Sequence, residues 1–287
     1  MTQLCDLHTH SVFSDGTLTP TQLVELAEDL GLGAVALTDH NTILGLPEFL
    51  TAAQGKKLKA VPGVEFSVDY LDKELHILAL FIQPKDYAAI SEISDELNRN
   101  KQKSNIDLIE ALRKDGYDLS YEKIKASMPA GEPNRALIAA ELTRLGYTAS
   151  VQDAFQRLLS AKHGYYHPPK HIDAFELIDF VRSIGAVSVW AHPFLHLKQE
   201  QEVRQFLPRA IDAGLQGMEV MYPLFSPEQT QLAQELACEF SLLPSGGSDF
   251  HGENKPAISL GSGKGELRVP LAYCQALETL SKGRDAL

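Results

Sequence analysis

The chain has 287 residues, of which 44% are hydrophobic, and its formal net charge at pH 7 is −12. A chain of this length and composition can bury a sizeable core, as one barrel-sized domain or two smaller ones, which argues against disorder. The acidic balance opposes nonspecific affinity for a long polyanion, but it says little about a small phosphorylated ligand.

The longest apolar stretches have the length of strands rather than of membrane spans. Residues 34–38 and 77–82 fall far short of the roughly 20 residues that a membrane span needs. Asp6, His8 and His10 interrupt any apolar run at the N-terminus, so we expect no signal peptide. The three cysteines are widely separated and lack CxxC spacing, which argues against disulfides and against a thiolate zinc site. We therefore expect a cytoplasmic protein with reduced thiols and no membrane partner.

The N-terminal part of the chain predicts a strand followed by a helix. Residues 3–10 alternate between two faces, as in an extended segment, and they end in polar side chains. Thr19 then precedes a proline and a run of apolar residues at helical spacing, which Gly31 terminates. This pattern predicts a helix between those two residues.

Two more strands with polar ends come next. The apolar strand 34–38 is followed by Asp39 and His40, and a second strand, 59–66, carries Glu65 at its far end. Residues 67–75 are expected to form a turn region, after which His76 opens another apolar strand.

The C-terminal part repeats this rhythm. Asp173 is the predicted cap of a helix that ends at Gly185, and Ser226 caps another helix. Strands are predicted over residues 186–191, 218–221 and 242–246. Alternation of strands and helices in this way implies parallel strands joined by helical crossovers.

Residues 86–169 break the rhythm. Helical periodicity dominates there, as in Ile106, Ile109 and Leu112. We interpret this stretch as an inserted helical subdomain that recognises the substrate, within a main domain made of residues 1–85 and 170–287.

Most of the polar residues that follow the predicted strands are of types that bind metals. In a barrel of parallel strands the C-terminal strand ends meet at one mouth, so residues far apart in sequence can come together there. Imidazoles suit zinc, iron and manganese, and bridging carboxylates favour several ions close together, which is typical of a multinuclear hydrolytic centre. The candidate ligands are His8, His10, Asp15, His40, Glu65, His76, His192, Asp249 and His251.

Each candidate also has a structural alternative. His8 and His10 could be polar caps of a strand, Asp15 could fix a turn, and Asp39 could cap the loop after its strand. Nine such residues, all at or near the ends of predicted strands, together argue for the metal site. The remaining histidines fall outside that register, and we expect them at the surface: His163, His167, His171 and His196.

Seven short motifs together resemble the polymerase and histidinol phosphatase (PHP) family. They are Asp6-x-His8-x-His10, Ser14-Asp15-Gly16, Thr38-Asp39-His40, Pro62-Gly63-x-Glu65, His76, Ala191-His192-Pro193 and Ser248-Asp249-x-His251. The resemblance covers the whole chain and is closest to the branch of 3',5'-nucleoside bisphosphate phosphatases and short-RNA 5'-exonucleases. It implies a distorted (β/α)7 TIM-like barrel of the α/β class with a trinuclear centre.

The same resemblance implies a ligand set for two to three divalent ions, Mn, Zn or Fe. One ion would bind His8, His10, Glu65 and Asp249, a second Glu65, His76 and His192, and a third Asp15, His40 and His251. A hydroxide bridging the ions, held by His8, His10, Glu65 and Asp249, would attack phosphorus in line. We assign no general acid, although Asp39 is a candidate for protonating the leaving group.

The insertion departs from the family pattern. Where the resembling branch has a Gly-Arg-Pro-His segment that contacts substrate phosphate, this chain has Gly131-Glu132-Pro133-Asn134, followed by Arg135. Replacing a phosphate donor by an acid reverses the local charge, so either Arg135 takes over the role or the second phosphate binds differently. Candidate substrate contacts are Arg135, Lys162, Asn134 and Tyr166, the last of which could stack a base or pack against Pro168.

We therefore expect a metal-dependent phosphoesterase that converts a 3',5'-nucleoside bisphosphate to a nucleoside 5'-monophosphate and phosphate, and that also accepts short 5'-phosphorylated RNA. Histidinol phosphate or another small phosphomonoester is an alternative substrate. A non-catalytic metal-binding module attached to a polymerase is the alternative from another class. We expect no polymerase here, because the chain ends soon after the final motif. A related barrel hydrolase acting on C–N bonds would ordinarily need a metal-bridging lysine, and no lysine occupies a predicted strand end here. No long nucleic acid is expected as a partner, and the oligomeric state stays open.

Overall fold

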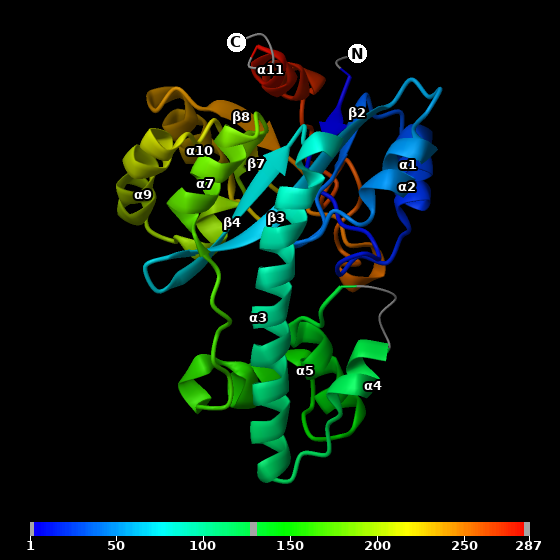
Figure 1. Ribbon diagram of the computed structural model, residues 1–287, viewed down its shortest axis with the longest axis vertical. Coiled ribbons are helices and arrows are strands. Elements are labelled where there is room, and N and C mark those ends of the chain that lie inside the picture. Colours follow the sequence, from blue (N-terminus) through cyan, green and yellow to red (C-terminus); the bar gives the residue numbers. More distant parts are fainter. Residues whose placement is uncertain (1–2, 127–130, 284–287) are drawn as a thin grey trace. The chain divides into compact units, whose positions relative to one another are not determined.

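The computed structural model describes residues 3–126 and 131–283. The chain forms two compact units, one made of Met1–Glu92 and Ile172–Leu287 and the other of Ile93–His171 (Figure 1). None of the helices in these described residues combines the length and the apolar composition that crossing a bilayer requires.

The first unit is built around a nearly closed sheet. Its strand order is β1-β2-β3-β4-β6-β7-β8, and β5 (Ile172–Asp173) pairs with β3 outside this path. The seven strands of the path are β1 (Cys5–Asp6), β2 (Ala34–Leu37), β3 (Lys59–Tyr70), β4 (Lys73–Leu80), β6 (Val187–Trp190), β7 (Gly217–Met221) and β8 (Leu243–Gly246). The amide of Leu7 donates to the carbonyl of Gly246 at 3.2 Å, which brings the first and last strands together. The predicted distorted seven-stranded barrel is confirmed.

Helices connect and cover these strands. The bounds in the first unit are α1 (Pro20–Asp29), α2 (Leu46–Ala52), α7 (Ala174–Ser183), α8 (Pro193–His196), α9 (Glu200–Ala213), α10 (Pro227–Glu239) and α11 (Leu271–Lys282), with 3-10 turns at Pro84–Asp86 and Gly252–Asn254. The predicted caps are present: the side chains of Thr19, Asp173 and Ser226 each accept a hydrogen bond from the first turn of the helix that follows.

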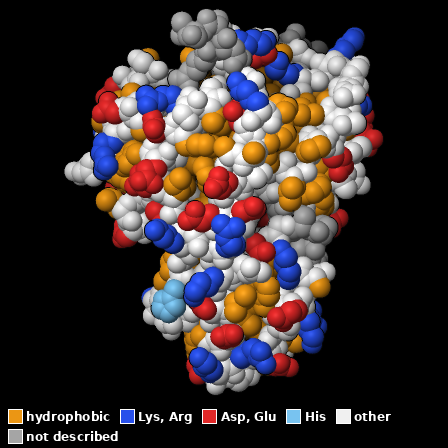
Figure 2. Space-filling model, viewed as in Figure 1, with side chains coloured by type: hydrophobic (Ala, Val, Ile, Leu, Met, Phe, Trp, Pro, Cys, Tyr) orange, Lys and Arg blue, Asp and Glu red, His pale blue; other side chains and the backbone are white. Residues whose placement is uncertain are grey.

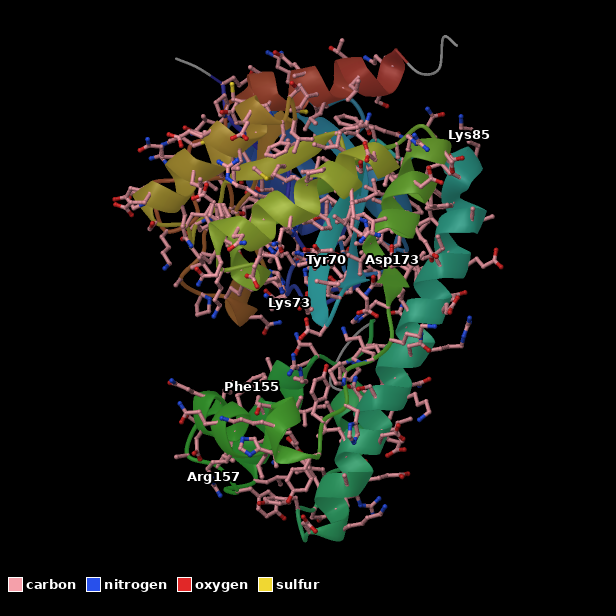
Figure 3. All side chains as sticks on the ribbon, turned by 90° about the vertical axis from the view of Figure 1, so that its left-hand side faces the viewer. Tyr70, Lys73, Lys85, Phe155, Arg157 and Asp173 are labelled. Atoms are coloured by element: carbon pink, nitrogen blue, oxygen red, sulfur yellow. The ribbon has the colours of Figure 1, made fainter. Side chains whose placement is uncertain are left out.

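The prediction that the strands are all parallel is wrong at β4. This strand runs antiparallel to β3 and to β6, and the expected turn region is mostly strand (Figures 1 and 3). Tyr70 pairs with Lys73, so only Leu71 and Asp72 link the two strands, and Leu71 has a φ of 57°. A two-residue link can only form a hairpin, which is antiparallel. Glu65 consequently lies in the middle of β3 rather than at its end.

An apolar cluster inside the first unit fixes the strands relative to one another. Leu7, Val61, Leu78 and Val189 come from four neighbouring parts of the sheet, and Leu277 of α11 packs against them; all are fully buried. Close packing of this kind leaves little freedom for the residues next to it. The polar residues that continue from these strands are therefore held on a rigid support.

The second unit is helical and has its own core. Its elements are α3 (Tyr87–Lys114), most of which lies in this unit, α4 (Tyr121–Ala126), α5 (Arg135–Arg144), α6 (Val151–Ala154), a π-helical turn at Phe155–Leu159 and a 3-10 turn at Ala161–His163. Buried leucines and isoleucines of α3 and α5, such as Leu108, Leu112, Ile138 and Leu142, form its centre. Figure 2 shows acidic and basic side chains mixed over the visible surface.

Candidate metal centre

The structure brings the nine predicted ligands together in one cluster. Potential ligand atoms lie within 4.8 Å of one another in four overlapping groups: His10, Asp15, His40 and His251; His8, His10 and Asp249; His8, Glu65 and His192; and His40, Glu65 and His76. Because the groups share members, the cluster is continuous. It joins residues separated by up to 243 positions in the sequence, from His8 to His251.

The hairpin of β3 and β4 explains how His76 reaches this cluster. His76 lies near the beginning of an antiparallel strand, opposite Ser67 and two residues beyond the level of Glu65. The start of β4 therefore lies at the same end of the sheet as the C-terminal ends of the parallel strands. Strand reversal preserves the site that parallel strands were predicted to form.

Glu65 stands at the centre of the cluster. Its side chain is fully buried, and its two oxygens face different imidazoles. Oε1 lies 2.8 Å from Nδ1 of His76 and 3.0 Å from Nε2 of His192, whereas Oε2 lies 3.2 Å from Nε2 of His8, 3.3 Å from Nε2 of His10 and 3.0 Å from Nδ1 of His40. A carboxylate so placed has the geometry to bridge two ions.

Several buried atoms in the cluster make no hydrogen bond. They are Nε2 of His8, Nε2 of His10 and Oε2 of Glu65. Leaving a buried polar atom unsatisfied costs about 1–3 kcal/mol, so such atoms rarely gather without a reason. Divalent cations would satisfy all three, and a set of imidazoles and carboxylates suits zinc, manganese or iron. The residues present therefore fit bound divalent metal.

The charges inside the cluster keep its carboxylates ionised. Burial by itself raises the pKa of Glu65, but His8 and His40 hold that pKa well below its usual range. The pKa of Asp249 is also well below its usual range, because His8 and His10, which both face this carboxylate, outweigh the effect of burial. Burial, with His251 and His40 nearby, lowers the pKa of His10 to about 4. Ionised carboxylates are the form that metal binding needs, whereas Glu65 outweighs burial and raises the pKa of His76 to about 10, so a metal bound there would displace a proton from that imidazole.

Two ligand candidates have strained backbones. His192 and Asp249 adopt left-handed φ angles of 30° and 55°, which L-residues rarely do. Such strain costs of order 1–3 kcal/mol and tends to occur at functional sites, where the surrounding structure holds it in place. Here the amide of Asp249 donates to the carbonyl of His8 at 2.9 Å, and the amide of His192 donates to the Glu219 carboxylate at 2.7 Å.

Glu219 is a site residue that the sequence did not reveal. It lies on β7, is fully buried, and places Oε1 3.0 Å from Nδ1 of His8 while Oε2 accepts from the His192 amide. It therefore orients two candidate ligands from one side chain. The available signal was a single acidic residue in the otherwise apolar strand Gly217–Met221.

One carboxylate oxygen of Asp249, Oδ2, accepts from two donors. The hydroxyl of Tyr222 donates to Oδ2 at 2.8 Å, and Nζ of Lys255 lies 2.7 Å from the same atom. The other oxygen, Oδ1, faces Nε2 of His10 at 3.2 Å. Lys255 thus places a positive charge beside the cluster, with 40% of its side chain exposed. Sequence reasoning missed it because it follows the last motif in a loop.

Asp39 anchors a loop. Oδ1 accepts from the amide of Ser11 at 2.7 Å and from the hydroxyl of Ser14 at 2.6 Å, and Oδ2 accepts from the hydroxyl of Ser11 at 2.6 Å. Burial raises the pKa of Asp39, although these hydrogen bonds counteract part of that effect. These donors belong to the loop that follows β1, and not to the loop after the strand of Asp39 itself, which was the structural alternative for this residue.

His196 is not the surface residue that the sequence predicted. Its ring is partly buried, with ring centroids 5.1 Å from that of His76 and 5.5 Å from that of His192. Burial, together with these two histidines, lowers the pKa of His196 to about 3. The spacing of four residues from His192 was the available signal, because residues i and i+4 lie on one face of a helical turn. His171 is also buried.

Three of the four predicted substrate contacts in the insertion, Asn134, Arg135 and Tyr166, have partners within the helical unit. Asn134 caps α5 by accepting from the amide of Leu137 at 3.0 Å. The Arg135 guanidinium lies 4.1 Å from the ring centroid of Tyr166, whose side chain is buried, whereas Lys162 is exposed. The unexpected Glu132 accepts from Tyr121 and pairs with Lys125.

Comparison with known proteins finds one family and several relatives. The PHP domain matches residues 6–166. A 5'-3' exoribonuclease of Haemophilus influenzae is 31% identical over 88% of this chain and 91% of its own length. A 3',5'-nucleoside bisphosphate phosphatase of Chromobacterium violaceum is 26% identical over 89% of this chain and 90% of its own.

A solved structure agrees with these matches. The crystal structure of a protein assigned as a metal-dependent phosphoesterase, from Bifidobacterium adolescentis, superposes with a TM-score of 0.83 and 31% sequence identity. The superposition covers 97% of this chain and 96% of that one. The likeness therefore includes both the barrel unit and the helical unit.

Proposed function

We propose, from the premise that this chain belongs to the PHP domain family and is a metal-dependent phosphoesterase, that it hydrolyses the 3'-phosphate ester of a 5'-phosphorylated nucleotide. With a 3',5'-nucleoside bisphosphate the products are a nucleoside 5'-monophosphate and phosphate. With a short 5'-phosphorylated RNA the same attack at the 3' phosphorus releases the first nucleotide. The names of two relatives, an exoribonuclease and a bisphosphate phosphatase, support this pair of substrates.

The observation that carries the proposal is the position of Glu65 among five imidazoles, with its oxygens turned to two different sets of them. We propose that it bridges ions in a centre of two to three divalent metals. The first ion would be held by His8, His10, Glu65 and Asp249, the second by Glu65, His76 and His192, and the third by Asp15, His40 and His251. Bound divalent ions lower the pKa of water and offset the charge that develops on phosphoryl oxygens.

Other residues of the chain prepare this centre. Glu219 fixes the ring of His8 so that Nε2, not Nδ1, faces the centre. Tyr222 and Lys255 occupy Oδ2 of Asp249 and leave Oδ1 as the ligand atom. Since a phosphoryl group in the centre would come close to Asp249, the partly exposed ammonium of Lys255 is placed to bind one of its oxygens.

The discriminating experiment compares substrates with the metal-loaded protein. After chelation and reloading with Mn²⁺, phosphate or nucleotide release is measured from adenosine 3',5'-bisphosphate, AMP, histidinol phosphate and a short RNA with and without a 5'-phosphate. We expect the bisphosphate and the 5'-phosphorylated RNA to be the best substrates, and the chelated protein to be inactive.

Preference for histidinol phosphate or AMP would reject the proposed substrate but not the phosphoesterase class. Equal rates on RNA with and without the 5'-phosphate would reject recognition of that group.

Two basic residues can be tested as alternative phosphate contacts. Lys255→Gln should raise KM by about tenfold for every substrate, because a hydrogen bond between charged groups contributes about 1.5–3 kcal/mol and the ammonium is partly exposed. Arg135→Ala should raise KM only for substrates that carry a second phosphate, if Arg135 holds that phosphate as predicted. Steady-state kinetics on AMP and on the bisphosphate separate the two.

An unchanged KM in the Lys255 variant, with unchanged metal content, would remove Lys255 from substrate binding. A loss of thermal stability in the Arg135 variant without a substrate-dependent effect would assign Arg135 to packing against Tyr166 alone.

A further inference from the structure

A third histidine ring accompanies His76 and His192 on the side of the cluster that faces Oε1 of Glu65. The centroid of His196 is 5.1 Å from that of His76 and 5.5 Å from that of His192, and the centroids of His76 and His192 are 5.1 Å apart. The three rings therefore stand at the corners of a nearly equilateral triangle. One nitrogen of each ring lies within 4.8 Å of the corresponding nitrogens of the other two.

This triangle has the size expected of three imidazoles around one ion. With metal–nitrogen distances of about 2.0–2.1 Å, ring centroids lie ~3.2 Å from the ion and, at tetrahedral angles, ~5.2 Å from one another. The mutual tilts of 70°, 48° and 38° also leave the rings splayed rather than stacked face to face. Hydrophobic packing alone gives no reason for three polar rings to adopt this spacing.

The nitrogens of these rings need partners. Among the residues that the structure describes, no hydrogen bond or ion pair involves the ring nitrogens of His196. Nδ1 of His192 is buried without a hydrogen-bond partner, in a side chain only 4% exposed. Ring packing gives a hydrogen-bond partner neither to the nitrogens of His196 nor to Nδ1 of His192. A metal ion would give a partner to one nitrogen of His196.

We propose that His196 is a metal ligand, and that it adds a third imidazole to His76 and His192 at the second ion of the centre, a divalent transition metal. The short connection supports this role: α8 is a single turn, so His192 and His196 are tied to each other by four residues of chain. His76 comes from β4, which pairs with β6, the strand that precedes α8. The site therefore depends on the strand reversal at β4 as well as on the turn of α8.

The proposal gives this end of the centre a distinct chemistry. Three imidazoles beside a single carboxylate, Glu65, suit Zn²⁺ or Co²⁺ better than the oxygen-preferring Mg²⁺ or Ca²⁺. Removing His196 should therefore weaken the binding of zinc and cobalt in particular.

The test measures metal binding rather than turnover, and it uses the full chain. Metal-free protein is titrated with Co²⁺ and with Zn²⁺, the dissociation constants are determined by chelator competition, and bound metal is counted by elemental analysis. For His196→Ala we expect either one equivalent less or a dissociation constant at one site raised by at least about tenfold, the loss that even an outer partner of a ligand produces. The visible absorption of bound Co²⁺ should change as well.

Two further variants make the result decisive. His196→Gln serves if the alanine variant does not fold, and thermal unfolding of the metal-free proteins establishes which of them do. His167→Ala, an exposed histidine of the helical unit, is the matched control and should bind metal as the unaltered protein does. Unaltered stoichiometry, affinity and cobalt spectrum in both His196 variants would overturn the proposal.

This inference rests on the proposed metal centre, and His8→Ala tests that centre separately. Loss of metal in the His8 variant but not in the His196 variants would support the proposed centre and show that His196 is not one of its ligands. Full metal content in the His8 variant would instead reject the ligand set proposed for the centre.

Discussion

Replacing His8 by alanine, or Asp249 by asparagine, should lower kcat by at least about 10³-fold while the protein still folds. Removal of a single group that stabilises transition-state charge already costs about 10²–10³ in rate, and each of these variants also removes a ligand of the proposed first ion. Nε2 of His8 lies 3.2 Å from Oε2 of Glu65, and Oδ1 of Asp249 lies 3.2 Å from Nε2 of His10. Both side chains therefore contact buried atoms of the cluster that make no hydrogen bond. Phosphate release under saturating Mn²⁺ is the measurement.

Controls of the same residue types separate this effect from a general one. His167→Ala and Asp212→Asn alter exposed residues of the two units and should leave kcat within a factor of about two, as surface substitutions usually do. Thermal unfolding of the metal-free proteins shows whether the fold survives. Turnover close to that of the unaltered protein in either site variant would remove that residue from the centre.

Glu219→Gln should weaken metal binding by about 10–100-fold, which is the usual effect of losing the outer carboxylate of a metal-bound histidine. Glutamine retains the size of the side chain and can still accept from Nδ1 of His8, but it lacks the negative charge that makes the imidazole a better ligand. Calorimetric titration with Mn²⁺ or Zn²⁺ measures the change. Because Glu219 positions His8 and does not itself face the ion, added metal should restore most of kcat.

The matched control for this second prediction is Glu48→Gln. Glu48 also accepts two hydrogen bonds, from the amide and hydroxyl of Thr21 at 3.0 and 2.8 Å, but it belongs to none of the candidate ligand groups in the described chain. Its replacement should leave metal affinity unchanged. If Glu219→Gln binds metal as tightly as the control does, Glu219 only satisfies the His192 amide.

The ligands were predictable because few residue types bind metals and because their positions relative to strands could be inferred. His8 and His192 each come shortly after the end of a buried strand, and a metal-binding side chain in that position can be recognised without coordinates. The helix caps at Thr19 and Ser226 depend only on neighbouring residues, so local sequence sufficed for them as well.

What the sequence did not reveal depends on contacts between distant residues or on an atypical turn. The link of β3 to β4 contains Leu71 in a left-handed conformation where a glycine or asparagine would have signalled a hairpin. Glu219 is one acid in an apolar strand, and only the folded chain shows that His8, 211 residues away, is its partner. His196 lies on the helical turn after a strand and not at the strand end, which is where the sequence pattern placed the ligands.

The pairing of β5 with β3 has a consequence for the evolution of this chain. Ile172 lies beside Val68, so the chain rejoins the barrel unit on a strand next to the one that carries Glu65, after an excursion of 79 residues from Ile93 to His171. The entropy of closing such an excursion grows only with the logarithm of its length, by about 0.6 kcal/mol for each doubling. Lengthening, shortening or exchanging the excursion thus costs the barrel unit little stability, and related chains can diverge there while their metal ligands stay the same.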